Sequence, residues 1–132
     1  MKVLIIDGQG GGLGRQLVSA VKEKCPETEV LAVGTNSTAT GAMLRAGADQ
    51  AATGENAVLV ACRKADVIIG PVGIVIADSM LGEITPAMAV AVGQSRARRI
   101  LLPVNQCDNI VVGVADLSMA DKVQEAVELL GR

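Results

Sequence analysis

Short apolar runs alternate along this chain with segments whose apolar residues recur at helical spacing. Runs of this kind predict strands at residues 2–6, 30–33, 48–52, 67–69, 100–104 and 110–112. Strands that alternate with helices are typical of a parallel sheet covered on both faces. The sequence therefore predicts an α/β protein, a three-layer Rossmann-like fold with a mainly parallel sheet of five to six strands. Right-handed crossovers favour the strand order 3-2-1-4-5.

Residues that favour helix ends place the predicted helices between these runs. The first helix follows a glycine cluster and stops at Cys25-Pro26. The N-caps predicted for the other four are Thr38 or Thr40, Asn56, Thr85 and Ser118. Residues 72–84 fit neither a helix nor a strand pattern. No repeat or linker interrupts the alternation, so we expect one Rossmann-like domain over residues 1–132.

Composition argues against several classes of partner and of chemistry. No apolar run approaches the roughly 18 residues that span a bilayer, and no secretory segment opens the chain, so we expect a cytoplasmic protein without membrane contact. The three cysteines lack metal-ligand spacing and the chain has no histidine, so no metal is expected. A net charge of −2 and the absence of Phe, Tyr and Trp argue against binding of nucleic acid.

A glycine cluster between the first strand and the first helix carries the clearest chemical signal. Glycine permits tight turns and a close approach of the backbone to a ligand, and a helix start offers unpaired N–H groups to an anion. The residues that we expect to hold a phosphate there are Gly8, Gln9, Gly10, Gly11, Gly12, Gly14 and Arg15. The alternative is that these glycines serve only the packing of the helix against the strand.

Gly8, Gly12 and Gly14 fit the pattern GxxxGxG, which resembles the fingerprint of short-chain dehydrogenases. That resemblance implies NADP or NAD as cofactor, but the Tyr of the family's catalytic pair is missing from a chain without Tyr. No carboxylate follows the second strand, where an acid would bind the ribose of NAD. NADP is therefore favoured over NAD.

Polar or glycine-rich residues also follow other predicted strands, and ligands of open α/β sheets lie outside the carboxyl ends of the strands. The additional ligand contacts predicted in this way are Thr35, Asn36, Ser37, Gly70, Pro71, Gly73 and Asn105. A polar turn that caps the next helix explains residues 35–37 equally well. The sequence thus predicts a nucleotide-binding domain with a crevice at this edge of the sheet.

Several longer stretches resemble an uncharacterised family of short bacterial proteins, known as a domain of unknown function. The stretches that carry the resemblance are LIIDGQGGGLGRQL, AVGTNSTATGAMLRAGAD, ATGEN, ADVIIGPVGIVIADSMLGEIT and ILLPVNQC. The resemblance covers nearly the whole chain. It implies a Rossmann-like fold and assigns no activity.

Two other functions remain open beside the binding of a nucleotide or another phosphorylated ligand. The first is a small enzyme acting on a phosphorylated metabolite, in which Asp7, Asp78 or Glu83 would move protons. The second is a structural or regulatory subunit. Residues 72–93 carry more apolar side chains than one small domain is expected to cover, so we expect a homo-oligomer, most simply a dimer. In the competing account this segment folds back over its own sheet.

Overall fold

The computed structural model describes residues 1–104 and 108–131. It confirms the predicted α/β architecture. The elements in chain order are β1 (Lys2–Asp7), α1 (Gly12–Lys24), β2 (Glu29–Gly34), α2 (Ser37–Arg45), β3 (Gln50–Thr53), α3 (Glu55–Cys62), β4 (Val67–Pro71), the 3-10 turn η1 (Val72–Val75), α4 (Pro86–Gln94), β5 (Arg98–Leu102) and α5 (Met119–Leu130).

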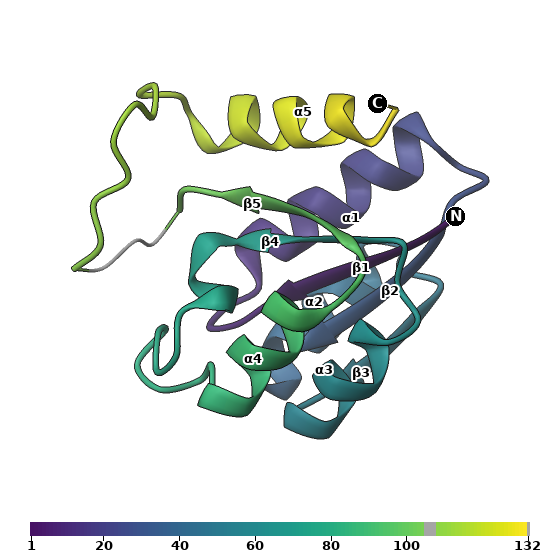
Figure 1. The fold of residues 1–132 in the computed structure, drawn as a ribbon. Coiled ribbons are helices and arrows are strands. Elements are labelled where there is room, and N and C mark those ends of the chain that lie inside the picture. The colour runs from purple at the N-terminus through teal and green to yellow at the C-terminus, as the bar shows by residue number, and fades with distance from the viewer. Residues whose placement is uncertain (105–107, 132) are drawn as a thin grey trace.

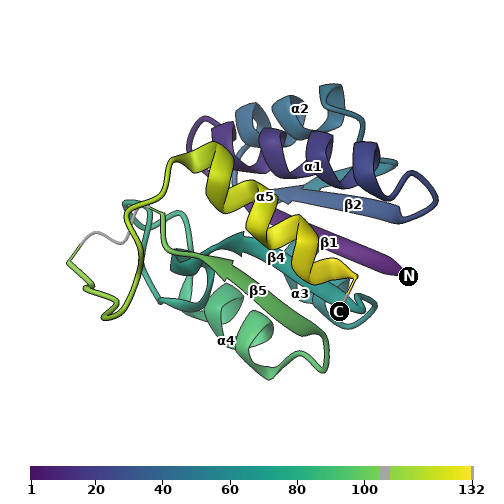
Figure 2. The ribbon, with the colours of Figure 1, turned by 90° about the horizontal axis from the view of Figure 1, so that it is seen from above.

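All neighbouring strands of the sheet are parallel, in the order β3-β2-β1-β4-β5. This is the predicted order. Figure 1 shows α1 and α5 on one face of the sheet and α3 and α4 on the other, and Figure 2 shows α1 lying between α2 and α5. The sheet is therefore the middle of three layers.

Alternation of side chains along the strands supplies a core on each face of the sheet. On β1, Val3 and Ile5 pack with the core that α1, α2 and α5 cover, whereas Leu4 and Ile6 pack with the core under α3 and α4. All four of these side chains are buried. A strand with both faces covered needs a continuous apolar run, which is what the first predicted strand showed.

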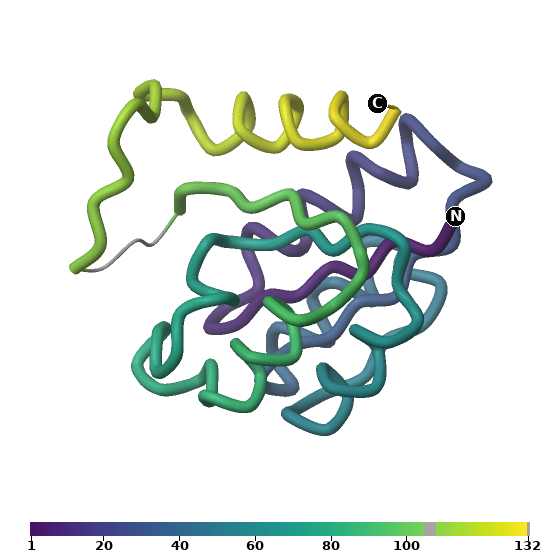
Figure 3. The backbone as a smooth tube through the Cα atoms, in the orientation of Figure 1, coloured from purple at the N-terminus to yellow at the C-terminus, as the bar shows by residue number. Residues whose placement is uncertain are grey.

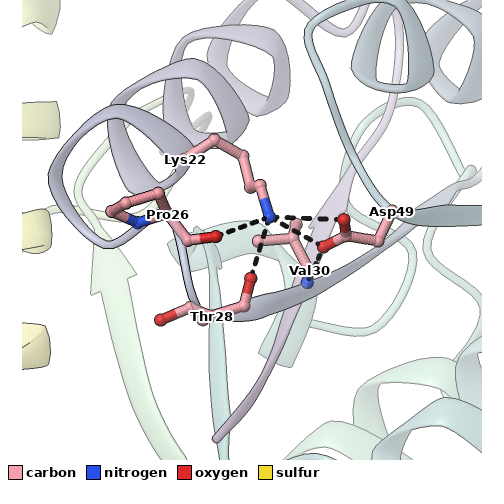
Figure 4. A network of polar contacts seen from close by, with 5 residues as sticks. All are labelled: Lys22, Pro26, Thr28, Val30 and Asp49. Atoms are coloured by element: carbon pink, nitrogen blue, oxygen red, sulfur yellow. Dashed lines mark hydrogen bonds and ion pairs between the residues drawn. The ribbon is translucent and has the colours of Figure 1, made fainter.

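The end of α1 is joined to the sheet by the ammonium group of Lys22 (Figure 4). Its Nζ donates to the carbonyl oxygen of Thr28 at 3.0 Å and forms an ion pair of 3.0 Å with Asp49. Asp49 also accepts from the backbone N–H of Val30, and this hydrogen bond together with Lys22 lowers the pKa of Asp49. The network links the amino end of β2 to the turn before β3.

Two predicted helix caps are confirmed and two are wrong. The hydroxyls of Thr85 and Ser118 cap α4 and α5. The cap of α2 is Asn36, whose side chain accepts from the N–H of Ala39, because the helix begins before Thr38 and Thr40. The cap of α3 is Gly54, because the helix begins at Glu55, one residue before Asn56.

The strand predicted at residues 110–112 is absent from the described part of the chain, which has five strands. Ile110 is 90% exposed and Val112 is 93% exposed, so these two side chains cover no core. The apolar pattern was misleading because a run of this kind forms a buried strand only where the fold covers it, and this run stays at the surface.

Residues 76–84, named here the fold-back segment, follow η1 as a series of turns. Asp78, Met80 and Leu81 have positive φ angles of 66°, 56° and 56°, which neither a helix nor a strand uses. This backbone explains why the sequence pattern assigned neither element. The side chains of Met80 and Ile84 are buried against the core under α3 and α4. Most of the apolar excess of residues 72–93 is thus covered within the chain, as the competing account expected.

Among the described residues, no helix is long and apolar enough to cross a membrane.

Candidate functional site

The loops that follow β1, β2 and β4 meet at one end of the sheet. The tube in Figure 3 shows the segment after β4 curling back at the same end as the turn after β1. The order of the strands reverses beside β1, where β2 lies on one side and β4 on the other. Such a switch point is where open α/β sheets bind ligands. The glycine cluster, residues 8–14, lies directly at it and is called the glycine turn below.

The carboxylate of Asp7, the last residue of β1, organises the glycine turn from inside. Its Oδ1 accepts from the N–H of Gly8 at 2.8 Å and its Oδ2 accepts from the N–H of Gly14 at 2.7 Å. Burial raises the pKa of Asp7, the two hydrogen bonds oppose that rise, and the negative charge of Glu83 adds to it. Asp7 therefore serves the structure of the turn by joining its first and last N–H groups.

The glycines of the turn differ in what surrounds them. A Cβ atom on Gly14 would lie 2.8 Å from the Cβ of Asp7, so this glycine permits the close contact of α1 with β1. Gly11 has φ +74° and lies against the backbone of Ala39. A Cβ atom on Gly10 or Gly12 would meet nothing within 4 Å. The packing explanation therefore accounts for Gly11 and Gly14 but not for Gly10 and Gly12.

The start of α1 presents unpaired donors to the same end of the sheet. The N–H groups of Gly12 and Leu13 have no hydrogen-bond acceptor among the described residues, and no acidic residue lies in the first turn. Unpaired N–H groups and the positive end of the helix dipole attract an anion. Arg15 follows with an exposed side chain on the first turn of α1.

A carboxylate from the fold-back segment lies beside the glycine turn. The Oε1 atom of Glu83 accepts from the N–H of Gln9 at 2.9 Å, from the hydroxyl of Thr35 at 2.5 Å and from the side-chain amide of Asn36 at 2.8 Å. Desolvation opposes the ionisation of Glu83, but these three hydrogen bonds outweigh it and lower the pKa of Glu83. Glu83 is therefore held as a carboxylate at the end of β2.

This arrangement corrects the expectation that the end of β2 has no carboxylate. The acid comes from a residue 48 positions beyond Thr35 in the sequence. No local sequence signal could have placed it there, because only the fold-back of residues 76–84 brings it across the glycine turn. With a carboxylate at the end of β2, NADP is no longer favoured over NAD.

The ligand contacts predicted after the other strands differ in whether a ligand can reach them. Thr35 and Asn36 lie at the site, whereas the side chain of Ser37 is exposed at the start of α2. Gly70, Pro71 and Gly73 are buried, and Gly73 lies under Ser79 of the fold-back segment. A ligand reaches Gly73 only if that segment moves, and Gly70 lies against Ile6 of β1 and Ile74 of η1. Asn105 lies outside the described residues.

Other candidate chemistry is sparse in the part of the chain that the structure describes. No group of three or more acidic or thiol side chains is placed to hold a metal ion there. Asp78 is exposed. Burial raises the pKa of the Cys62 thiol to about 11, so this cysteine is a packed core residue and not a nucleophile.

Grooves elsewhere on the molecule do not include the glycine turn. One of about 820 Å³ lies between α3 and α4, lined in part by Arg63, Lys64 and Arg96. Another of about 250 Å³ lies between α3 and the strands β2 and β3. At the glycine turn, Met80 and Glu83 come so near to Gly8 that a Cβ atom there would lie 2.9 Å from the Met80 sulfur. The fold-back segment thus covers the Gly8 end of the turn and leaves Gly10 and Gly12 exposed.

Comparison with known proteins supports the fold. The structure is similar to a dodecameric FMN-dependent UbiX-like decarboxylase from Escherichia coli O157:H7, with 18% identity and a TM-score of 0.51 over 99% of this chain and 76% of the other. It is also similar to a protein called AibC, with 21% identity and a TM-score of 0.50 over 97% of this chain and 38% of the other. No curated protein matches the chain. The sequence matches a family over residues 2–132, and the chain thus belongs to the family described as domain of unknown function (DUF3842).

Proposed function

We propose that this protein binds a nucleotide or another phosphorylated ligand, with the phosphate at the glycine turn. The observation that carries the proposal is the pair of unpaired N–H groups of Gly12 and Leu13 at the start of α1, beside open space at Gly12. A phosphate oxygen would accept from both N–H groups and would gain from the helix dipole. Packing alone gives no reason for a glycine at position 12.

Three nucleotides are candidates for the ligand. NADP and NAD are the candidates that the sequence suggested, and the similar decarboxylase is FMN-dependent, which adds FMN as a third. FMN carries a phosphate monoester, NAD a diphosphate and NADP both, so a phosphate site at the glycine turn suits each of them. The chain offers no aromatic side chain to stack on the base or the flavin ring, so aliphatic walls would contact it.

Gly12→Val is expected to weaken the binding of the nucleotide at least about tenfold while the fold persists. The branched side chain would occupy the space where the phosphate approaches the N–H groups, and one lost charge-assisted hydrogen bond corresponds to about 1.5–3 kcal/mol. Calorimetric titration of FMN, NAD and NADP into the original chain and the variant would measure the change.

The matched control for this experiment is Gly93→Val, whose added Cβ also meets nothing within 4 Å but lies on α4, away from the glycine turn. It should bind as the original chain does. A folded Gly12→Val protein with unchanged affinity for a nucleotide that the original chain binds would remove the helix start from the site. Failure of all three nucleotides to bind the original chain would reject the nucleotide proposal.

We also propose that the protein is a homo-oligomer. Val90 on α4 remains 52% exposed beside the groove between α3 and α4, and Leu81 is 96% exposed. Light scattering at micromolar concentration is expected to give the mass of a dimer or a larger assembly. Val90→Asp should dissociate it without unfolding the chain. A monomer mass for the original chain would reject this proposal.

A further inference from the structure

We propose that the Glu83 carboxylate is an internal stand-in for an anionic group of the ligand, and that the fold-back segment is a lid which an incoming phosphate displaces. This inference rests on the proposed function and names a second anion position within the same site. The position is formed by the N–H of Gln9, the hydroxyl of Thr35 and the side-chain amide of Asn36.

The donors around Glu83 form a built site for a negatively charged oxygen. All three donate to the same atom, Oε1, at 2.5–2.9 Å. They come from the glycine turn and from the end of β2, two elements that stay in place without the lid because the sheet and α1 and α2 hold them. Converging neutral donors of this kind accept a carboxylate or a phosphate oxygen alike.

The contacts that hold the lid to the rest of the chain allow a ligand to displace it. Its backbone has three residues other than glycine with positive φ, at Asp78, Met80 and Leu81, a conformation that persists only where other contacts enforce it. Backbone hydrogen bonds within the segment, such as that from the N–H of Asp78 to the carbonyl of Ile84, help to enforce it. The contacts that hold the segment to the rest of the chain are the buried side chains of Met80 and Ile84, the hydrogen bonds from the Ile76 N–H and the Ser79 hydroxyl to the carbonyl of Gly73, and Glu83. Glu83 is the member of this group that a ligand can compete with.

If Glu83 competes with the ligand, the affinity for an anion depends on the charge of Glu83. While the carboxylate occupies the donors, the affinity for phosphate is reduced by the fraction of molecules in which the site is free. A carboxylate beside the glycine turn also repels a second anion. Removing the charge while keeping the size of the side chain relieves both effects, so an anion should bind more tightly.

The test is a titration of inorganic phosphate followed by amide chemical shifts in the original chain, Glu83→Gln and Asp78→Asn. We expect Glu83→Gln to bind phosphate at least about tenfold more tightly than the original chain, with shifts at the Gln9 amide and at the Asn36 side-chain amide. Asp78→Asn removes one negative charge from the same segment, and Asp78 is exposed. It should bind as the original chain does.

A second variant tests whether tighter phosphate binding comes from the freed donors or only from a loosened lid. Thr35→Val also breaks a contact of Glu83, but it removes a donor that the ligand would need. When it is added to Glu83→Gln, the gain in phosphate affinity should disappear. A gain that survives in the double variant would overturn the inference, because Thr35 would then serve the lid alone.

The amide shifts distinguish failure of this inference from failure of the proposed function. Shifts at Gly12 and Leu13 in every protein, without tighter binding by Glu83→Gln, would overturn the inference and leave the proposed phosphate position intact. Shifts at Gln9 and Asn36 alone in Glu83→Gln would support the inference and reject the helix start as the phosphate position. No response to phosphate in any of the proteins would overturn both.

Discussion

Gly14→Val is expected to lower the free energy of unfolding by about 3 kcal/mol, within the upper range for overpacking of a buried contact. A Cβ atom at this position would lie 2.8 Å from the Cβ of Asp7 and 2.5 Å from the Met43 sulfur. The Met43 side chain can adjust, but the Cβ of Asp7 is attached to the backbone of β1, between β2 and β4 in the sheet. α1 would have to move away from the strand, which would also stretch the hydrogen bond from Gly14 to Asp7.

Denaturant unfolding of the variant beside the original chain would measure this loss. Gly12→Val is the matched control, because it makes the same change two residues earlier in the same helix, where nothing lies within 4 Å of the added Cβ. It should unfold close to the original midpoint. Equal stability of the two variants would show that the contact between α1 and β1 at Gly14 is not as close as the structure has it.

Asp7→Ala is expected to lower the free energy of unfolding by about 2–6 kcal/mol, the combined penalty of two buried N–H groups left without an acceptor, at about 1–3 kcal/mol for each. The Asp7 side chain is only 5% exposed, so water cannot replace it readily at the N–H groups of Gly8 and Gly14. The loss should be accompanied by faster hydrogen exchange of the Gly14 amide. Exchange and denaturant unfolding would both report it.

Asp7→Asn separates the hydrogen bonds of this side chain from its charge. The amide can accept from one of the two N–H groups while its own NH2 faces the other, so the cost should lie between that of Asp7→Ala and zero. Because the pKa of Asp7 is raised from its ordinary 3.8, the original chain should lose part of its stability as the pH rises through the raised pKa. That part of the pH dependence should be missing in Asp7→Asn. A stable Asp7→Ala protein at neutral pH would contradict the role given to Asp7.

The sequence by itself determined the order of strands and helices and the topology of the sheet. Both follow from local physics. Apolar runs such as residues 67–69 must be buried on both faces, and right-handed crossovers leave few orders for five parallel strands. Thr85 and Ser118 were predicted as caps because an N-cap needs only its own side chain and the next three residues. The glycine turn was found for the same reason, since a strand, a glycine cluster and a helix follow one another in the chain.

The tertiary structure alone decided what surrounds that turn. Gly12 and Gly14 look alike in the sequence, and only the position of β1 and α2 makes one open and the other closely packed. Residues 110–112 have the apolar pattern of a strand, yet Ile110 and Val112 remain exposed and the described sheet ends at β5. Glu83 reads as a surface acid within an unassigned segment. Its contact with Thr35 spans 48 positions and depends on a run of positive φ angles that no apolar pattern encodes, so its place at the glycine turn could come only from the folded chain.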